Sequence, residues 1–315
     1  MTLLSVGVLG ARGHVGVELL SLLGRHPGVR LAAVGSRALA GRRVADEIPG
    51  CGGDLAYRDL RPAEAAALDL DAWILALPNG EAAPFVAAIA ARRPSTILID
   101  LSADFRFDDG WQYGLVERNR ERLRGARRIA NPGCYATGMQ LAIAPLLELL
   151  EGAPVVFGVS GYSGAGTTPS PRNDPDRLRD NLMPYALVGH LHEREATRHL
   201  GHPIAFMPHV APFFRGITLT IALPLSAPIS VGELRARAAE AWRGERLISV
   251  TDEVPLVRDA VGKHGVTIGG FAVADDGRRA VVVATLDNLR KGAATQALQN
   301  LNLAAGLDEL WGIFE

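Results

Sequence analysis

Cys134 and a group of histidines are the residues of this sequence best suited to covalent chemistry. Cys134 follows Asn131-Pro132-Gly133 and precedes the apolar run ATGMQLAIAPLLELL, whose spacing predicts a helix bent at Pro145. The cysteine would then lie in or just before the first helical turn, where the helix N-terminus favours the nucleophilic thiolate. Free cysteines are also commonly buried and inert, so position alone leaves both interpretations open.

Histidines that could serve as the base for such a thiol are concentrated in one segment. Five of the eight histidines lie between residues 190 and 209, and His190 and His192 form an H-x-H pair. A histidine beside Cys134 could activate the thiol and later transfer a proton. We expect no metal, because Ala196 stands where the H-E-x-x-H zinc pattern needs its second histidine. A serine hydrolase is also disfavoured, since GVSGYSGAG does not match G-x-S-x-G.

A glycine-rich turn near the N-terminus predicts a dinucleotide site. Gly10, Gly13 and Gly16 follow a predicted strand over 3–10 and open a predicted helix over 15–26. Glycines allow the backbone to turn sharply and approach a pyrophosphate, and the helix N-terminus offers N–H groups to the phosphates. The alternative is a tight turn that merely requires glycine.

The end of the second predicted strand favours NADP over NAD. NAD sites usually place an acidic residue there to bind the ribose 2′-OH. This chain instead has Ser36-Arg37, with Arg42 and Arg43 close behind and no acid until Asp46. A guanidinium can make charge-assisted bonds to a 2′-phosphate. The alternative is that Arg37 is simply exposed.

The elements that must position these residues change in character near residue 150. In 1–150, apolar strands alternate with helices, which predicts a Rossmann-like, doubly wound parallel sheet that binds NADP. In 151–287, we expect an α+β catalytic and dimerisation domain with a mixed or antiparallel sheet, and in 288–315 a C-terminal helix that packs back onto the first domain. The predicted strands cover 3–10, 29–36, 71–78, 95–102, 154–166, 201–213, 216–225 and 280–288, the further helices cover 80–93 and 230–244, and an exposed polar loop covers 167–177.

Bulk composition narrows the class of protein. The 315 residues carry a net charge of −1 and are 48% hydrophobic, which gives no reason to expect a nucleic acid or an anionic membrane as partner. The basic run 118–128 alternates with glutamate and reads as a solvated helix face. No stretch approaches the roughly 18 apolar residues of a membrane span. Two cysteines, Cys51 and Cys134, form no disulfide framework, so we expect a cytoplasmic protein.

Seven motifs follow one another along the chain. They are GARGHVGVELL (10–20), DLSADFR (100–106), NPGCYAT (131–137), SGYSGAG (160–166), GHLH (189–192) with Glu195 after it, FRGI (214–217) and DNLRKGAATQALQNLN (287–302). In this order they resemble the motifs of the N-acetyl-γ-glutamyl-phosphate reductase family, which is related to aspartate-semialdehyde dehydrogenase. The resemblance spans nearly the whole chain.

The resemblance implies roles for individual residues. Cys134 would be the nucleophile and His192 the acid–base, with His190 close enough to compete for that role. Substrate-binding residues would be Arg106, Ser163, His190 and Arg215. Cofactor-binding residues would be Gly10, Arg12, Gly13, His14, Val15, Gly16, Ser36, Arg37, Pro78, Gly164 and Asn288.

The implied reaction is the NADPH-dependent reduction of N-acetyl-L-glutamyl 5-phosphate to the 5-semialdehyde in arginine biosynthesis. It would proceed through a Cys134 thioester with release of phosphate, in a homodimer or homotetramer. Thr167-Thr168 replace the basic residue usual after Ser-Gly-Ala-Gly, and Glu195 lacks its usual preceding proline; both departures bear on substrate detail.

Two alternatives remain open. A sibling enzyme would reduce aspartyl phosphate or a carrier-protein-bound glutamyl or aminoadipyl phosphate. A non-catalytic NADP-binding regulator would keep the glycine turn but need neither Cys134 nor His192.

Overall fold

The computed structural model describes residues 3–313, which divide into two compact units. One unit contains the described residues up to Pro132 and those from Ala293 onward, and the other is Gly133–Gly292. Each unit is built on its own seven-stranded sheet. The chain passes from the first unit to the second between Pro132 and Gly133, whereas the sequence pattern predicted the change near residue 150.

The first unit contains an all-parallel sheet, as predicted. Its strand order is β3-β2-β1-β4-β5-β7-β6, and every neighbouring pair is parallel. The order reverses direction between β1 and β4, which is typical of a doubly wound fold and places a ligand crevice at the carboxyl ends of these strands. The strands are β1 (Leu4–Leu9), β2 (Val29–Gly35), β3 (Tyr57–Arg58), β4 (Ala72–Leu75), β5 (Ile97–Asp100), β6 (Gln112–Tyr113) and β7 (Arg128–Ala130).

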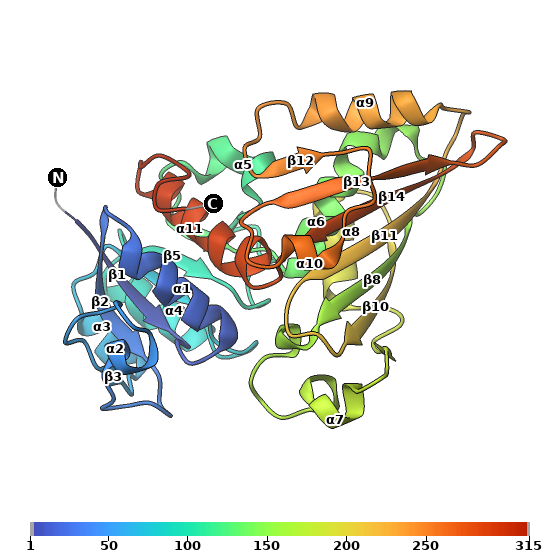
Figure 1. Ribbon diagram of the computed structural model, residues 1–315. Helices are drawn as coiled ribbons and strands as arrows, with labels where there is room; N and C mark the ends of the chain where they lie inside the picture. Colours follow the sequence, from blue (N-terminus) through green and yellow to red (C-terminus); the bar gives the residue numbers. More distant parts are fainter. Residues whose placement is uncertain (1–2, 314–315) are drawn as a thin grey trace. The chain divides into compact units, whose positions relative to one another are not determined.

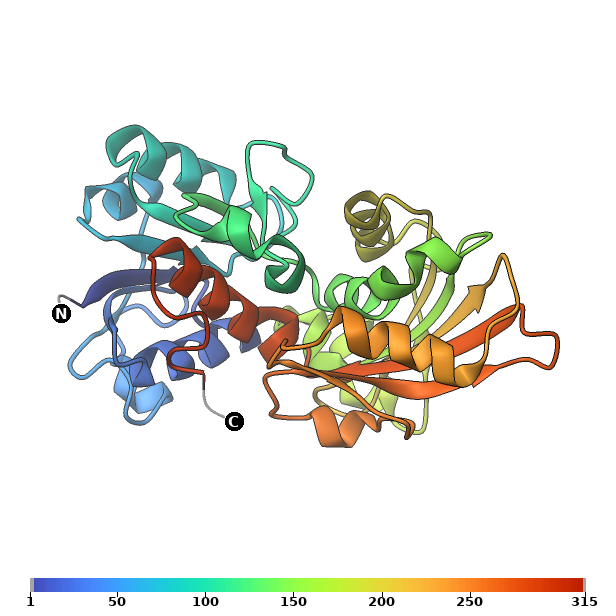
Figure 2. The same cartoon turned by 90° about the horizontal axis from the view of Figure 1, so that it is seen from above.

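Helices cover both faces of this sheet because its strands are apolar on both sides. Leu19 of α1 (His14–Arg25) and Leu298 of α11 (Thr295–Ala304) share one core with Val6, on the face that α5 (Val116–Leu123) also covers. Ile89 of α4 (Ala83–Arg92) shares a second core with Trp73, on the face that α3 (Pro62–Ala67) also covers. Figure 2 shows α4 on one side of the sheet, and α1 and α11 on the other. The short helix α2 (Val44–Glu47) follows β2.

The second unit contains a mixed sheet, also as predicted. Its order is β12-β13-β14-β11-β8-β10-β9, with β12–β13 and β8–β10 parallel and the other pairs antiparallel. The predicted strand over 154–166 is too long, because the chain leaves the sheet at Gly161 for a short 3-10 turn (Tyr162–Ala165). The strands are β8 (Val155–Gly161), β9 (Met183–Pro184), β10 (Ala205–Ala211), β11 (Ile217–Pro224), β12 (Ile248–Val250), β13 (Val266–Val273) and β14 (Arg279–Leu286).

Helix α6 (Cys134–Ile143) is the central helix of the second unit. Every residue after Cys134 in this helix is buried, since the helix packs between α8 (Leu191–Leu200) and strands β11 and β14. These contacts explain why the units divide before Cys134. A 3-10 helix (Ala144–Leu149) replaces the α-helix at Pro145, which confirms the predicted interruption. The remaining helices are α7 (Pro175–Leu178), α9 (Val231–Ala241) and α10 (Val257–Ala260).

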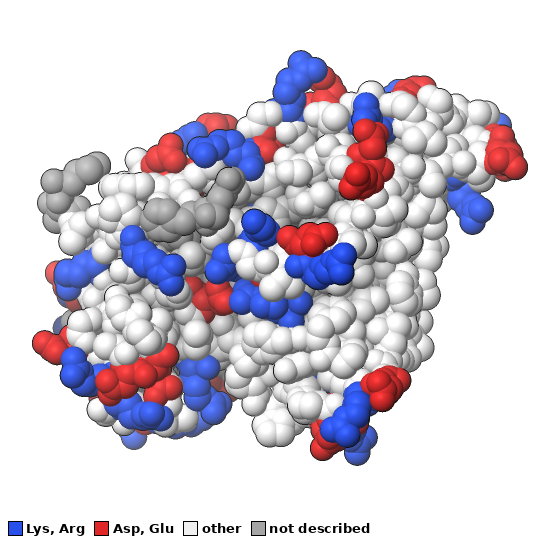
Figure 3. Space-filling view, viewed as in Figure 1, with Lys and Arg blue, Asp and Glu red and all other residues white. Residues whose placement is uncertain are grey.

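One face of the second sheet is open, and the row across its middle is uncharged. Phe157 of β8 lies opposite Met207 of β10 and Thr220 of β11, and Thr220 lies opposite Val283 of β14. This row lies on the side of the sheet opposite the buried Val156, Leu219 and Ile221, and Phe157 is 38% exposed. Helices α6 and α8 lie behind this sheet in Figure 1, and the surface over β8 and β11 in Figure 3 is largely free of charged side chains.

None of the helices within residues 3–313 has the length and apolar character that crossing a membrane requires. The basic run 118–128 falls on α5 and its C-terminal flank, where Leu123 faces the core and Arg122 and Arg124 are exposed, as expected for a solvated helix face.

Candidate active site

The glycine turn between β1 and α1 has no room for a side chain at two of its three glycines. Gly10 has φ +77°, and a Cβ there would lie 2.1 Å from the carbonyl oxygen of Ala76. A Cβ on Gly16 would lie 2.7 Å from the backbone of Ala11, so strand and helix approach closely. Gly13 is different, since its nearest neighbour would be 3.6 Å away.

The start of α1 is suited to an anion. Within the described residues, no side chain caps this helix by a hydrogen bond, and its first turn contains no acidic residue. The positive end of the helix dipole is therefore not offset locally. The turn also contains the other residues predicted for the cofactor here, namely exposed Arg12 and partly buried His14 and Val15.

The end of β2 brings Ser36 and Arg37 to the same edge of the sheet. Ser36 is buried, and its N–H donates to the carbonyl of Arg58. Arg42 pairs with Glu47 at 2.5 Å and Arg43 with Asp54 at 2.9 Å. Arg37 is exposed and makes no hydrogen bond or ion pair with any residue from 3 to 313. Of these three arginines, Arg37 is the one left for a ligand.

Arg106 binds backbone carbonyls of the first unit. It is 7% exposed, its Nε donates to the carbonyl of Asn131 at 2.9 Å, and its Nη2 donates to that of Leu101 at 2.8 Å. Arg106 thereby holds the segment that leads to Cys134. Its role in substrate binding stays a prediction. Pro78 lies in the loop after β4, where the neighbouring Gly80 N–H donates to Asp104 at 2.7 Å.

Cys134 is the first residue of α6 and is held from two sides. The N–H of Gly133 donates to Oε1 of Glu195 at 2.8 Å, and Glu195 is completely buried in α8. On the other side, Gly292 packs so closely that a Cβ there would lie 2.7 Å from that of Cys134. Cys134 is half-buried and reduced, and Cys51 is buried and reduced. The thiol thus lies at a helix N-terminus, where the dipole favours the thiolate.

The two candidate bases lie together at the start of α8, with ring centroids 5.0 Å apart. His190 caps this helix, because its Nδ1 accepts the N–H of His192 at 3.1 Å. Burial, and to a smaller extent the charge of Arg172, lowers the pKa of His190 to about 4. His190 is therefore neutral at pH 7, with its proton on Nε2 and its Nδ1 already occupied.

Two tyrosines complete this cluster. The Tyr135 ring lies 6.2 Å from His190 and 6.0 Å from His192, and its hydroxyl donates to the carbonyl of His209 at 2.8 Å. The Tyr185 ring lies 5.5 Å from His190. Burial raises the pKa of Tyr135 well above its usual value and that of Tyr185 to about 12, so both hydroxyls stay protonated. Neither tyrosine was predicted as a site residue from the sequence.

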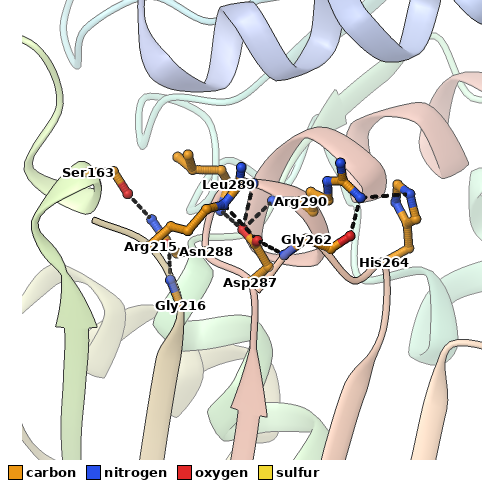
Figure 4. Close-up of polar contacts among 9 residues, drawn as sticks. All are labelled: Ser163, Arg215, Gly216, Gly262, His264, Asp287, Asn288, Leu289 and Arg290. Carbon is orange, nitrogen blue, oxygen red and sulfur yellow. Dashed lines mark hydrogen bonds and ion pairs between the residues drawn. The ribbon is translucent and has the colours of Figure 1, made fainter. Parts of the chain in front are cut away.

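Arg215 and Asp287 form the centre of a second polar cluster (Figure 4). Nε and Nη2 of Arg215 contact the two carboxylate oxygens of the completely buried Asp287 at 2.7 and 3.0 Å. Asp287 also accepts the N–H of Gly262 at 2.7 Å. The guanidinium of Arg215, which the resemblance assigns to substrate binding, is thus directed at a carboxylate of the protein itself.

Asn288 and Ser163 are bound to each other in the same cluster (Figure 4). Nδ2 of Asn288 donates to the Ser163 hydroxyl at 2.9 Å, and its Oδ1 accepts the N–H of Gly216 at 2.7 Å. Both side chains are buried. Gly164 is the next residue after Ser163, and a Cβ on it would lie only 3.1 Å from the Ser160 hydroxyl. The arrangement joins β11 and β14 to the 3-10 turn after β8.

His264 lies at the far end of this cluster. Nη1 of Arg290 contacts its Nε2 at 3.3 Å and also binds the Gly262 carbonyl. Because arginine only donates, Nε2 of His264 must accept, and its proton lies on Nδ1. Among residues 3–313, no group of three His, Cys, Asp or Glu side chains could hold a metal ion.

Family models match nearly the whole chain. Residues 5–126 match the family described as semialdehyde dehydrogenase, NAD binding domain, which shows a nicotinamide cofactor for the first unit. Residues 134–288 match the family described as semialdehyde dehydrogenase, dimerisation domain. The two matches correspond closely to the two units of the structure.

Individual proteins are similar over the full length. The N-acetyl-γ-glutamyl-phosphate reductase of Xanthomonas campestris pv. campestris (strain B100) is 59% identical over 309 residues, covering 98% of both chains. That of Stenotrophomonas maltophilia (strain R551-3) is 57% identical with the same coverage. Among solved structures, aspartate semialdehyde dehydrogenase II from Vibrio cholerae has a TM-score of 0.79 at 20% identity, covering 97% of this chain and 99% of that one, and so shares the fold.

Proposed function

Because the chain belongs to the N-acetyl-γ-glutamyl-phosphate reductase family, we propose that it reduces N-acetyl-L-glutamyl 5-phosphate to N-acetyl-L-glutamate 5-semialdehyde in arginine biosynthesis. The observation that carries the proposal is the placement of Cys134. A half-buried thiol begins helix α6, and the preceding N–H is bound by the buried Glu195. An acyl phosphate is an activated electrophile, and a thiolate at a helix N-terminus is a suitable nucleophile for it.

The reaction follows from this thiol. The Cys134 thiolate attacks the acyl carbon. The bond from that carbon to the phosphate oxygen then breaks, so that phosphate departs and a thioester remains on the cysteine. The reduced nicotinamide cofactor supplies a hydride when bound. The oxyanion left on the thioester carbon takes a proton from His192 to give a thiohemiacetal. This thiohemiacetal returns the proton to His192 as its C–S bond breaks, which releases the semialdehyde and restores the thiolate.

His192 is the proposed acid–base. Its competitor His190 uses Nδ1 as an acceptor for the His192 N–H, and burial holds its pKa at about 4. His190 can therefore donate from Nε2 but is a poor base at neutral pH. We assign His190 to orienting a substrate oxygen by donation, and the roles of Arg106, Ser163 and Arg215 in substrate binding stay predictions.

NADPH is the proposed form of the cofactor. The glycine turn fits a pyrophosphate, and Arg37 is exposed beside Ser36 without an ion-pair partner among the described residues. We expect Arg37→Ala to raise the KM for NADP by about 10- to 100-fold and to leave that for NAD unchanged. Arg43→Ala, at an exposed arginine already paired with Asp54, is the control. Equal effects on both cofactors would contradict a role for Arg37 at the 2′-phosphate.

The test of the reaction is phosphate-dependent reduction of NADP with N-acetylglutamate 5-semialdehyde, which runs the enzyme in reverse. We expect Cys134→Ser to lower the rate by three orders of magnitude or more, since the nucleophile is removed. Cys51→Ser is the matched control, because Cys51 is buried and its thiol only donates to the Leu20 carbonyl. Faster turnover of aspartate semialdehyde would assign the chain to the sibling activity instead.

The assembly is proposed to be a homodimer, or a tetramer built from such dimers, joined through the open face of the second sheet. The matched dimerisation-domain family covers this sheet, and its exposed row of Phe157, Met207 and Thr220 is uncharged. We also propose a cytoplasmic location, because a catalytic thiolate requires a reducing compartment.

A further inference from the structure

Arg172 lies in the segment where this chain departs from the family pattern. The segment after Gly166 folds around Asn173, whose Nδ2 donates to the carbonyls of Gly166 and Thr168 at 2.9 and 2.8 Å. Oδ1 of Asn173 accepts the N–H of Ser170 at 2.7 Å. These bonds close a short 3-10 turn (Pro171–Asn173), so Arg172 projects from an internally bonded loop.

The guanidinium of Arg172 lies on the aromatic ring of Tyr185, which belongs to the cluster of two histidines and two tyrosines described above. Its Cζ lies 5.0 Å from the centroid of the Tyr185 ring, which is cation–π distance. Tyr185 lies in turn beside His190, 5.5 Å between ring centroids. The charges of Arg172 and of Cys134 both act on Tyr185, in opposite directions on its pKa, and Arg172 also lowers the pKa of His190. Arg172, Tyr185, His190 and Cys134 therefore form one electrostatic neighbourhood within the second unit.

Arg172 has no carboxylate partner among the described residues, unlike its neighbours. Arg177 pairs with Asp174 and Arg179 with Asp176. The side chain of Arg172 is exposed, so one face lies on Tyr185 while the charge remains accessible. Arg215, the arginine that the sequence suggested for a substrate anion, already contacts Asp287 through two nitrogens.

We propose that Arg172 binds an anionic group of the acyl-phosphate substrate, either the phosphoryl group or the carboxylate. The inference rests on the proposed function. A guanidinium held on an aromatic ring loses less conformational freedom on binding, and its fork matches both phosphate and carboxylate. The residue thereby supplies, from five positions further along the chain, the positive charge that Thr167 does not.

Kinetics in the reverse direction separate the two anions. Arg172→Gln is expected to raise the KM for inorganic phosphate about 10- to 100-fold if Arg172 binds the phosphoryl group, or the KM for the semialdehyde by the same factor if it binds the carboxylate. In either case kcat changes less, and Arg172→Lys restores part of the loss. Arg177→Gln, in the same segment but ion-paired, is the control and should change neither KM. In an enzyme that turns over, two unchanged KM values for Arg172→Gln would overturn the proposal.

A second measurement does not depend on the substrate. In a Cys51→Ser background, the rates of Cys134 alkylation by iodoacetate and iodoacetamide are compared. A positive charge beside the thiol favours the anionic reagent, so Arg172→Gln should lower the iodoacetate-to-iodoacetamide ratio several-fold while Arg177→Gln leaves it unchanged. If the wild-type protein does not turn over the semialdehyde, the proposed function fails. The alkylation ratio then tests by itself whether the charge of Arg172 acts at Cys134. An unaltered ratio would then overturn the role of Arg172.

Discussion

Asp100 is a completely buried carboxyl group at the end of β5. Its Oδ2 accepts the hydroxyl of Ser102 at 2.6 Å, but Oδ1 has no hydrogen-bond partner within the described part of the chain. Burial raises its pKa to about 6, against the hydrogen bonds from Ser102 that lower it. A buried carboxylate with one oxygen unsatisfied is costly, so this group opposes folding once it ionises.

We expect Asp100→Asn to stabilise the protein at high pH. The folded state holds the Asp100 proton up to about pH 6, whereas the unfolded state releases it near 3.8. Stability is therefore lost as the pH rises through this window. Asparagine does not ionise and retains an acceptor for Ser102. The gain in the free energy of unfolding should reach about 3 kcal/mol at pH 8 and about half of that at pH 5.

Urea denaturation at the two pH values measures this difference. Asp54→Asn is the control, because that carboxyl is fully exposed and should show no pH-dependent gain. A gain for Asp100→Asn that does not grow between pH 5 and pH 8 would contradict the assignment of the raised pKa to this residue.

The residues of the site differ in how far sequence could predict them. Cys134 and the pair His190 and His192 could be proposed from the sequence because their motifs are local. Their contacts could not, because Glu195 reaches Gly133 and Tyr185 reaches His190 only through tertiary packing. The orientation of Arg215 toward Asp287 likewise depends on two strands, β11 and β14, meeting in the sheet. Spacing along a chain has no information about such contacts.

The glycine turn shows which part of an element serves the fold and which part serves a ligand. Gly10 and Gly16 are required by the protein itself, since added Cβ atoms would lie 2.1 and 2.7 Å from backbone atoms. Gly13 has no such restriction, with 3.6 Å to its nearest neighbour, and its φ of −63° suits any residue. A methyl group at Gly13 would therefore clash only with a bound phosphate.

Alanine substitutions should therefore separate stability from cofactor binding. We expect Gly13→Ala to change the melting temperature little and to raise the KM for NADP by at least about tenfold. Gly10→Ala should lower stability by about 1–3 kcal/mol or more, from strain at positive φ and the clash with Ala76. Thermal unfolding with and without NADP tests both. A Gly13→Ala protein that binds NADP as the wild type does would show that no phosphate lies against this turn.

Elements were predicted well where the apolar pattern is continuous. β1, β2, β4 and β5 are short apolar runs bounded by helices, and their bounds agree with the prediction to within three residues. Several short elements were not anticipated, and two longer ones were missed as well. β13 contains Gly269 and Gly270 at a register shift, which interrupts its alternation, and α8 is strongly polar on its exposed side. The unit boundary before Cys134 was also hidden, because α6 follows β7 with only three residues between them.

At the scale of the whole molecule, the open face of the second sheet is the feature that isolated elements do not explain. Its strands alternate as expected for a half-buried sheet, yet the outward row of Phe157, Met207 and Thr220 is uncharged. Val155, for example, is 42% exposed on an inner strand of the sheet. Exposed apolar surface of this kind typically marks a protein–protein interface. A face related to itself by a two-fold axis would cover this row in both copies.

Phe157→Asp should therefore weaken the assembly. A carboxylate on each copy would meet apolar surface and its own symmetry mate, which costs desolvation and adds repulsion. We expect the wild type to be a dimer or tetramer by light scattering and Phe157→Asp to dissociate at micromolar concentration. Val254→Asp is the control, since Val254 is more exposed (60% against 38%) but lies in the loop after β12. A Phe157→Asp protein of wild-type mass would place the interface elsewhere, because a buried, unpaired carboxylate could not persist at the centre of this face.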